Sequence, residues 1–259
     1  MSAAIEFRNV SYAAAQGRLL LDGISFVVEQ GTTVAILGRS GCGKTTLLRT
    51  VNRMLRPTQG EVLVEGRSIP ADLVSFRRKI GYVIQETGLF PHFTVERNVG
   101  LVPELLGWSR ADRTRRTREL LAMVGLDPEG FASRYPHRLS GGQRQRVGLA
   151  RALAADPGIL LMDEPFGALD PLTRAEMQDT LRGLLARLKK TVLLVTHDLD
   201  EALYLADKIV LLGSGKLVAH LDPAQFMRSS LPEIASYIRA FHRGERVATH
   251  ADPSEAHTP

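Results

Sequence analysis

Short apolar runs alternate with longer amphipathic segments along most of the chain. Some runs are apolar throughout, which is typical of parallel strands that helices cover on both faces: Thr33–Leu37, Ile159–Met162, Thr191–Val195 and Lys208–Leu212. Others alternate apolar and polar positions, which predicts antiparallel strands with one face in water: Ile5–Val10, Ile24–Val28 and Gly60–Val64. We therefore expect an α/β fold with a mixed, mainly parallel sheet and an antiparallel β subdomain.

Helical periods replace the strand pattern between Pro91 and Pro136. Ser109 suits the N-cap of a helix, and Gly125 suits the position just after a helix ends. This stretch predicts a helical insertion subdomain over about residues 91–150.

The chain of 259 residues shows no internal repeat and no low-complexity linker, so we expect one folded domain over residues 1–243. Its last helix is predicted around Leu231–Arg243. Residues 244–259 are polar and contain proline, which predicts a disordered tail.

The composition, with 44% hydrophobic and 24% charged residues, is that of a globular protein. The single cysteine excludes an internal disulfide. The N-terminus has no secretory signal pattern, and no apolar run approaches the roughly 18 residues that span a bilayer. A net charge of +5 permits nucleic-acid binding, but the basic runs Arg77–Lys79 and Arg113–Arg118 have no aromatic residues between them. We interpret these runs as solvated helix faces.

A glycine-rich loop carries the strongest chemical signal. Between a predicted strand and a predicted helix, the sequence fits the phosphate-loop pattern G-x-x-x-x-G-K-[ST], in which backbone N–H groups and a helix N-terminus surround phosphate oxygens. Lys44 is expected to neutralise the β and γ phosphates, Thr45 to offer its hydroxyl to Mg²⁺, and Cys42 to fill space. The nucleotide-binding residues in this stretch are Gly38, Arg39, Ser40, Gly41, Cys42, Gly43, Lys44, Thr45 and Thr46.

Two carboxylates follow the apolar strand Ile159–Met162, at the edge where α/β sheets bind ligands. Asp163 is expected to hold Mg²⁺ through water. Glu164 is then the candidate general base for the attacking water, a role worth about 10²–10⁴-fold in rate.

A second helix start also suits an anion. Ser140, Gly141, Gly142 and Gln143 open a predicted helix whose first backbone N–H groups have no partner within the helix. Because one loop already holds the nucleotide, we expect this helix end to bind the phosphates of a nucleotide on another copy of the chain.

With these motifs in this order, the chain resembles the nucleotide-binding subunits of ATP-binding cassette (ABC) transporters from about Ile5 to His220. The glycine-rich loop and Asp163-Glu164 match the family's two nucleotide motifs, and the segment from Ser140 to Gln143 matches its signature sequence. The resemblance implies a P-loop NTPase core that hydrolyses ATP with Mg²⁺.

The resemblance also assigns roles outside those motifs. Gln85 matches a glutamine that senses Mg²⁺ and links to the membrane subunit, and Asp170 matches a loop that crosses the dimer. His197 matches a histidine that contacts the γ-phosphate, and Tyr12 is placed like the aromatic residue that stacks on adenine. The implied catalytic set is Lys44, Gln85, Glu164 and His197, and the implied metal set is Thr45, Gln85 and Asp163.

The chain also resembles, more narrowly, the ATPase subunits of importers for glycine betaine, choline and similar osmoprotectants. This resemblance rests on the segments Arg77–Gln85, Gly88–His92, Asn98–Pro103 and Leu105–Trp108. It implies a homodimer that sandwiches two ATP molecules, permease subunits in the membrane, an extracytoplasmic solute-binding protein, and a peripheral position on the cytoplasmic face of the inner membrane. Such subunits often carry paired nucleotide-sensing modules after the ATPase domain, and the length of this chain leads us to expect none.

Other functions stay open. An importer ATPase for another small solute, such as an amino acid, would carry the same motifs, as would an exporter. A cassette ATPase of DNA repair or translation would suit the basic charge, but it is expected to carry coiled-coil inserts or a second cassette. A P-loop kinase or GTPase would leave Ser140–Gly142 and His197 without a role. We therefore expect no nucleic-acid partner.

Overall fold

The structure is a computed structural model that describes residues 2–85 and 87–249. Its central sheet has six strands in the order β10-β9-β3-β8-β7-β6. These strands are β3 Thr33–Leu37, β6 Ile80–Val83, β7 Ile159–Asp163, β8 Thr191–Val195, β9 Lys208–Gly213 and β10 Lys216–Leu221. All neighbours from β9 to β6 pair in parallel, and β10 pairs antiparallel with β9. The predicted mixed, mainly parallel sheet is confirmed.

Helices bury the central strands on both faces, as their continuous apolar sequences predict. Alternate residues of a strand point to opposite faces, so Leu160 and Met162 pack with α6 and α7, whereas Leu161 packs with α1. The bounds of these helices are α1 Lys44–Val51, α6 Gly141–Leu153 and α7 Pro171–Leu188.

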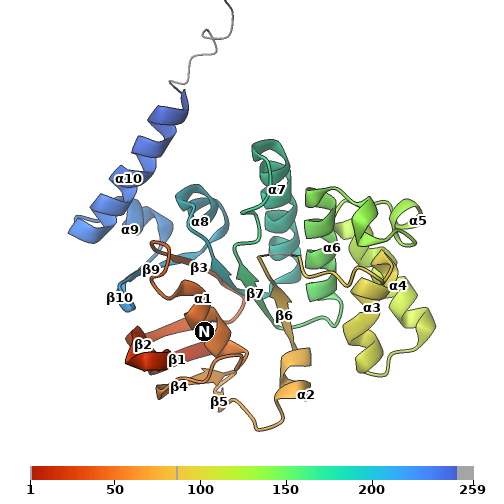
Figure 1. Ribbon diagram of the computed structural model, residues 1–259, viewed down its shortest axis with the longest axis horizontal. Helices are drawn as coiled ribbons and strands as arrows, with labels where there is room; N and C mark the ends of the chain where they lie inside the picture. Colours follow the sequence, from red (N-terminus) through yellow and green to blue (C-terminus); the bar gives the residue numbers. More distant parts are fainter. Residues whose placement is uncertain (1, 86, 250–259) are drawn as a thin grey trace, which may run out of the picture.

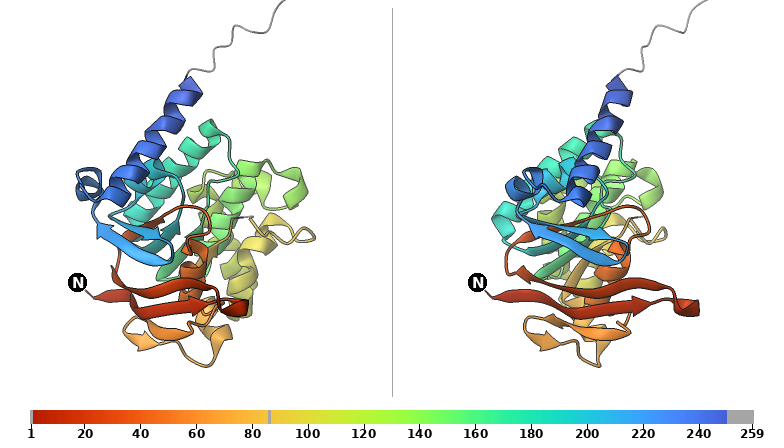
Figure 2. Two further views of the ribbon diagram at one scale, coloured as in Figure 1. Left: turned by 60° about the vertical axis from the view of Figure 1, so that its left-hand side comes forward. Right: turned by 90° about the vertical axis from the view of Figure 1, so that its left-hand side faces the viewer.

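The predicted antiparallel subdomain is a four-stranded sheet in the order β2-β1-β4-β5. Its strands are β1 Ala3–Ala13, β2 Leu19–Glu29, β4 Gln59–Val64 and β5 Arg67–Ser68, and the short 3₁₀ helix η1 Ala15–Gly17 joins the first two. Phe7 stacks on Phe26 with ring centroids 4.5 Å apart, in the same apolar cluster as α1. In Figure 2 this sheet, in red and orange, lies below the blue strands of the central sheet.

Helices occupy the predicted insertion and gather at the opposite end of the molecule from α10 (Figure 1). They are α3 Val95–Leu105, α4 Arg110–Met123, α5 Pro128–Phe131 and the 3₁₀ helix η2 Pro136–Arg138, followed by α6; α2 Leu73–Arg78 precedes them. The hydroxyl of Ser109 accepts a hydrogen bond from the Asp112 backbone N–H at 3.1 Å and so caps α4. Gly125, with φ of 73°, follows the end of the same helix.

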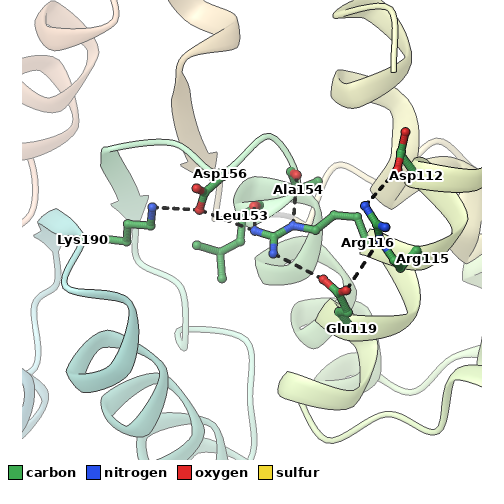
Figure 3. Close-up of polar contacts among 8 residues, drawn as sticks. All are labelled: Asp112, Arg115, Arg116, Glu119, Leu153, Ala154, Asp156 and Lys190. Atoms are coloured by element: carbon green, nitrogen blue, oxygen red, sulfur yellow. Dashed lines mark hydrogen bonds and ion pairs between the residues drawn. The ribbon is translucent and has the colours of Figure 1, made fainter. Parts of the chain in front are cut away.

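Most arginines of the two basic runs contact acidic side chains or backbone carbonyls of the same chain. Arg116 donates to the carbonyls of Leu153 and Ala154, and its guanidinium lies 3.5 Å from Asp156 (Figure 3). Three more arginines of α4 also form ion pairs: Arg113 with Glu104, Arg115 with Asp112 and Arg118 with Glu129. Arg77 and Arg78 donate to backbone carbonyls. These arginines therefore make contacts within the chain, and Arg113 and Arg116 are less solvated than the sequence predicted.

The C-terminal part of the described chain differs from the sequence prediction. After α8 Leu199–Leu205 and α9 Pro223–Met227, the last helix α10 runs over Pro232–Thr249. This helix includes residues 244–249, which belong to the stretch 244–259 that was predicted to be a disordered tail. Residues 250–259 lie outside the described part. No helix among the described residues is long and apolar enough to cross a membrane.

Buried Asn98 fixes the segment that follows β6. Its side-chain oxygen accepts a hydrogen bond from the Phe90 N–H at 2.8 Å, and its side-chain nitrogen donates to the carbonyls of Phe90, Phe93 and Thr94. Arg151 of α6 donates to the carbonyls of Thr87 and Gly88 from the other side. The chain after Gln85 is therefore held by two helices.

We expect Asn98→Asp to destabilise the protein although it conserves shape. The new carboxylate would face three carbonyl oxygens without a donor, and leaving buried polar groups unpaired costs roughly 3 kcal/mol. Asn52→Asp is the matched control, because buried Asn52 uses its side-chain oxygen to accept from the Met54 N–H and a carboxylate keeps that bond. Urea unfolding measures both variants, and equal free energies of unfolding would contradict the role of Asn98.

Candidate functional site

The glycine-rich loop leaves the end of β3 in a conformation that requires glycine. Gly38, Gly41 and Gly43 have φ values of 154°, 76° and 106°. A Cβ atom on Gly38 would lie 2.5 Å from both the Cys42 sulfur and the Leu212 carbonyl oxygen, and one on Gly43 would lie 2.6 Å from the Leu20 carbonyl oxygen. The glycines therefore allow the close turn that aims backbone N–H groups at one point in front of α1.

Lys44 begins α1 beneath this loop. Its ammonium donates to the carbonyls of Gly38 at 2.8 Å and Arg39 at 3.2 Å, and the residue is only 6% exposed. Cys42 is buried in the apolar cluster next to it, and burial raises the pKa of the Cys42 thiol. The loop thus holds one buried cation and one neutral thiol.

Thr45 connects the loop to the carboxyl edge of the central sheet. Its hydroxyl donates to the Asp163 carboxylate at 2.8 Å, and the Arg49 guanidinium lies 4.0 Å from the second oxygen of that carboxylate. Burial raises the pKa of Asp163, while the hydrogen bond from Thr45 and the charge of Arg49 oppose that rise. Tyr82 of β6 lies near the same group, and burial raises the pKa of Tyr82.

This arrangement fits a magnesium ion. Thr45 and Asp163 offer a hydroxyl and a carboxylate oxygen, and Gln85 offers an amide oxygen close by, which are the hard ligands that Mg²⁺ prefers. Within the described chain, no group of three or more His, Cys, Asp or Glu residues forms a metal cage. One carboxylate with few other protein oxygens suits Mg²⁺ that is bound together with substrate phosphates.

Glu164 lies at the meeting point of three strand ends. Its carboxylate accepts a hydrogen bond from the Gln85 side-chain amide at 3.3 Å and lies 3.5 Å from Nδ1 of His197. Gln85 follows β6, Glu164 follows β7 and His197 follows β8. Glu164 has φ of 46°, in the left-handed region that side chains rarely adopt, and its N–H donates to the Val195 carbonyl at 2.9 Å. Strain of this kind collects at functional sites.

A buried acid supports the segment around His197. The Thr196 hydroxyl donates to Glu201 at 2.6 Å and accepts from the Asp198 N–H at 3.0 Å. Burial raises the pKa of Glu201, and the hydrogen bond from Thr196 opposes it. Asp198 in turn caps α8 and lies 3.6 Å from Arg174.

The start of α6 forms an open helix end. Ser140 and Gln143 cap it reciprocally, because the Gln143 N–H donates to the Ser140 hydroxyl and the Ser140 N–H donates to the Gln143 side chain. A Cβ atom on Gly142 would lie 2.4 Å from Thr173, whereas Gly141 faces open space. Because the first N–H groups of an α-helix have no partner within the helix, those of Gly141 and Gly142 point out of this helix end.

Asp170 lies beside this helix end. It caps α7, and its carboxylate accepts from the Thr173 N–H at 3.0 Å. The hydrogen bonds from Thr173 lower the pKa of Asp170.

Two of the predicted groups are not joined to the loop. Among the described residues, no hydrogen bond or ion pair connects Ser140–Gln143 with the loop, and α6 lies on the far side of α7 from α1 (Figure 1). Tyr12 lies on β1 opposite Leu21, packed against the apolar cluster of that subdomain, and no polar contact within the described chain ties it to the loop.

Sequence analysis missed Arg49, Glu201 and Tyr82. Arg49 follows Thr45 by four residues on α1, and that spacing puts both side chains on one helix face. This signal was available in the sequence. Glu201 and Tyr82 are brought to the site by packing, and nothing in their local sequence marks them.

Comparison with known proteins agrees with this geometry. A family model described as "ABC transporter" matches residues 21–167. The choline transport ATP-binding protein OpuBA of Bacillus subtilis (strain 168) is 44% identical over 96% of this chain and 65% of its own length. The glycine betaine uptake system ATP-binding protein YehX of Escherichia coli (strain K12) is 46% identical over 94% of this chain and 85% of its own length.

A solved structure is also similar. The ATP-binding cassette MJ0796, described as a dimeric post-hydrolysis state bound to ADP and Pi, superposes with a TM-score of 0.76 and 35% identity over 85% of this chain and 98% of that chain. The chain spans about two thirds of the length of its Bacillus relative. The family match, the relatives and the arrangement of loop, carboxylates and histidine agree, so this chain belongs to the ABC transporter family of ATP-binding proteins.

Proposed function

We propose that the chain hydrolyses ATP as the energising subunit of an importer for a quaternary-ammonium osmoprotectant. One observation carries the enzymatic part: Glu164 contacts both Gln85 and His197 while the neighbouring Asp163 is bound to Thr45 of the phosphate loop. Phosphate-binding groups and a candidate base therefore lie on one sheet edge.

In the proposed reaction, the loop N–H groups and Lys44 hold the phosphates of ATP. Glu164 accepts a proton from a water molecule, whose oxygen attacks the γ-phosphorus, and the bond from that phosphorus to the bridging oxygen of ADP breaks. His197 and Gln85 orient the water and the γ-phosphate. Thr45, Gln85 and Asp163 would hold Mg²⁺, which when bound neutralises charge on the phosphates.

The proposed active unit contains two copies of the chain. The open end of α6 carries N–H groups that suit phosphate but lies apart from the loop of its own chain, and the similar solved cassette is described as dimeric. Each ATP would lie between the loop of one copy and the segment from Ser140 to Gln143 of the other. Asp170 would line the dimer contact, and Tyr12 would stack on adenine.

The proposed transport role is supported by relatives whose names refer to choline and glycine betaine. Permease subunits would rest near Gln85 and the helical insertion, where Phe90, Leu105 and Leu106 are exposed. This would put the chain on the cytoplasmic face of the inner membrane, with a solute-binding protein acting on the other side. No nucleic-acid partner is proposed, because arginines of the basic runs pair within the chain.

We expect Glu164→Gln to lower kcat at least about 100-fold while ATP affinity stays unchanged, because the amide cannot accept the proton from water. ATP should then trap a stable dimer. Steady-state ATPase assays and size-exclusion chromatography measure both effects. Glu61→Gln, which changes an exposed acid of β4, is the matched control and should behave like wild type. Wild-type turnover by Glu164→Gln would overturn the base assignment.

The shared sites can be tested by mixing two inactive variants, Lys44→Ala and Gly141→Asp. Each homodimer carries the lesion in both sites, whereas the mixed dimer has one site with an intact loop and an intact helix end. We expect mixing to restore about a quarter of wild-type ATPase activity, since half of the dimers are mixed and one site in each works. Complete absence of rescue would show that each chain completes its own site.

The solute is tested by uptake in cells that lack this chain. We expect radiolabelled choline or glycine betaine uptake to be lost, to return with the wild-type chain and to stay absent with Glu164→Gln. Loss of amino-acid uptake instead would reassign the substrate, and unchanged uptake of all these solutes would remove the importer role.

A further inference from the structure

The first half of α10 packs against the central sheet at β9, on the side of the molecule that carries the phosphate loop. Ile234, Tyr237, Ile238 and Phe241 recur at helical spacing and pack into one apolar cluster with Leu211 of β9 and its neighbours. Ile234 is fully buried. The helix is therefore part of the folded core at this point, and the side chains of its inner face have defined positions.

Tyr237 reaches from α10 to two segments of the site. Its hydroxyl donates to the backbone carbonyl of His197 at 3.0 Å. The Gly38 backbone lies near the same hydroxyl. Gly38 opens the phosphate loop and His197 follows β8, so Tyr237 is bonded to one of the segments that flank the phosphate site and lies beside the other.

The Tyr237 hydroxyl keeps its proton over the pH range in which proteins work. Burial raises its pKa to about 12. The neutral hydroxyl can therefore donate its proton to the His197 carbonyl, which a phenolate could not do.

α10 and the phosphate loop line the same cavity. A cavity of about 930 Å³ is lined by Arg39, Ser40 and His197 on the nucleotide side and by Glu233 and Tyr237 on the α10 side. The helix therefore forms a wall of the space in front of the phosphate loop.

The His197 ring has little other support. Its side chain is 63% exposed, and its polar contact within the described chain is Nδ1 to Glu164 at 3.5 Å. The direction of the ring is therefore set by the backbone of His197, whose carbonyl is the group that Tyr237 holds.

We propose that Tyr237 is a positioning residue for ATP hydrolysis, because its hydroxyl fixes the His197 backbone through a hydrogen bond to the carbonyl and so aims the imidazole at Glu164 and the γ-phosphate. This inference rests on the proposed ATPase function. The proposal makes α10 part of the hydrolytic site. Tyr237 would act on the orientation of His197, whereas other residues bind the nucleotide.

Tyr237→Phe tests the hydroxyl alone, since the ring and its packing remain. We expect kcat to fall about tenfold, because misplacing a catalytic group by about 1 Å can cost roughly 100-fold and the loss of one hydrogen bond should move the ring less than that. KM and ATP affinity should stay within twofold of wild type. Tyr204→Phe is the matched control: it removes a hydroxyl that donates to Asp179 on α7, away from the site, and should leave kcat unchanged.

A double-mutant cycle separates positioning from loss of stability. In a His197→Ala background, Tyr237→Phe should lower the residual rate less than twofold, because the group it positions is gone. Thermal melting of every variant is measured alongside. A tenfold loss that persists in the His197→Ala background would overturn the proposal, since Tyr237 would then act on something other than His197.

The outcomes also distinguish this proposal from the function on which it rests. If the wild-type chain does not hydrolyse ATP, the proposed function fails. If it does hydrolyse ATP and His197→Ala lowers the rate, but Tyr237→Phe matches Tyr204→Phe, only the role of Tyr237 fails. A tenfold loss in kcat without a change in KM or melting temperature, absent from the His197→Ala background, supports it.

Discussion

Parallel pairing of the buried strands is the constraint on which the site depends. Parallel strands end at the same edge, and the register sets Asp163 opposite Val195 and Val195 opposite Ile36. The residues that follow these positions, Glu164 and His197 among them, must therefore lie side by side. The strands remain in register because both of their faces are buried under helices and the antiparallel sheet. The packing of the strands therefore sets the positions of these polar groups, and it does not require a bound nucleotide.

The buried charges follow the same logic, since a charge in the core is stable only when it is paired or hydrogen-bonded. Lys44 is held by two loop carbonyls and Asp163 by a hydroxyl, so neither needs a nucleotide to exist in the fold. Phosphate and metal would replace these partners rather than fill a gap. Such preorganisation lowers the reorganisation needed when charge develops during hydrolysis.

The sequence predicts those parts of the site that local backbone conformation determines. It does not predict the parts that tertiary packing determines. The loop of Gly38 to Thr45 was predictable because only glycine tolerates its backbone angles, and Asp163-Glu164 because a polar pair after an apolar strand marks a sheet edge. Tyr237 could not be predicted, since its partner His197 lies 40 residues away along the chain and tertiary packing alone brings them together. Glu201 lies five residues from its partner Thr196, but the local sequence does not show that its carboxylate is buried. The extent of α10 to Thr249 was also not apparent from the sequence, which is polar and contains proline in this region.

Glu164 lies between two segments that are anchored to different parts of the molecule. On one side, Asn98 and Arg151 of the helical insertion hold the chain after Gln85. On the other, Glu201 and Tyr237 of the C-terminal part hold the chain around His197. The contacts of Glu164, 3.3 Å to Gln85 and 3.5 Å to His197, are long for hydrogen bonds and depend on how these two anchored parts sit relative to each other. Under the proposed function, a small shift of the helical insertion would change the positions of the base and its water together, so that a permease subunit bound there would alter the rate of hydrolysis.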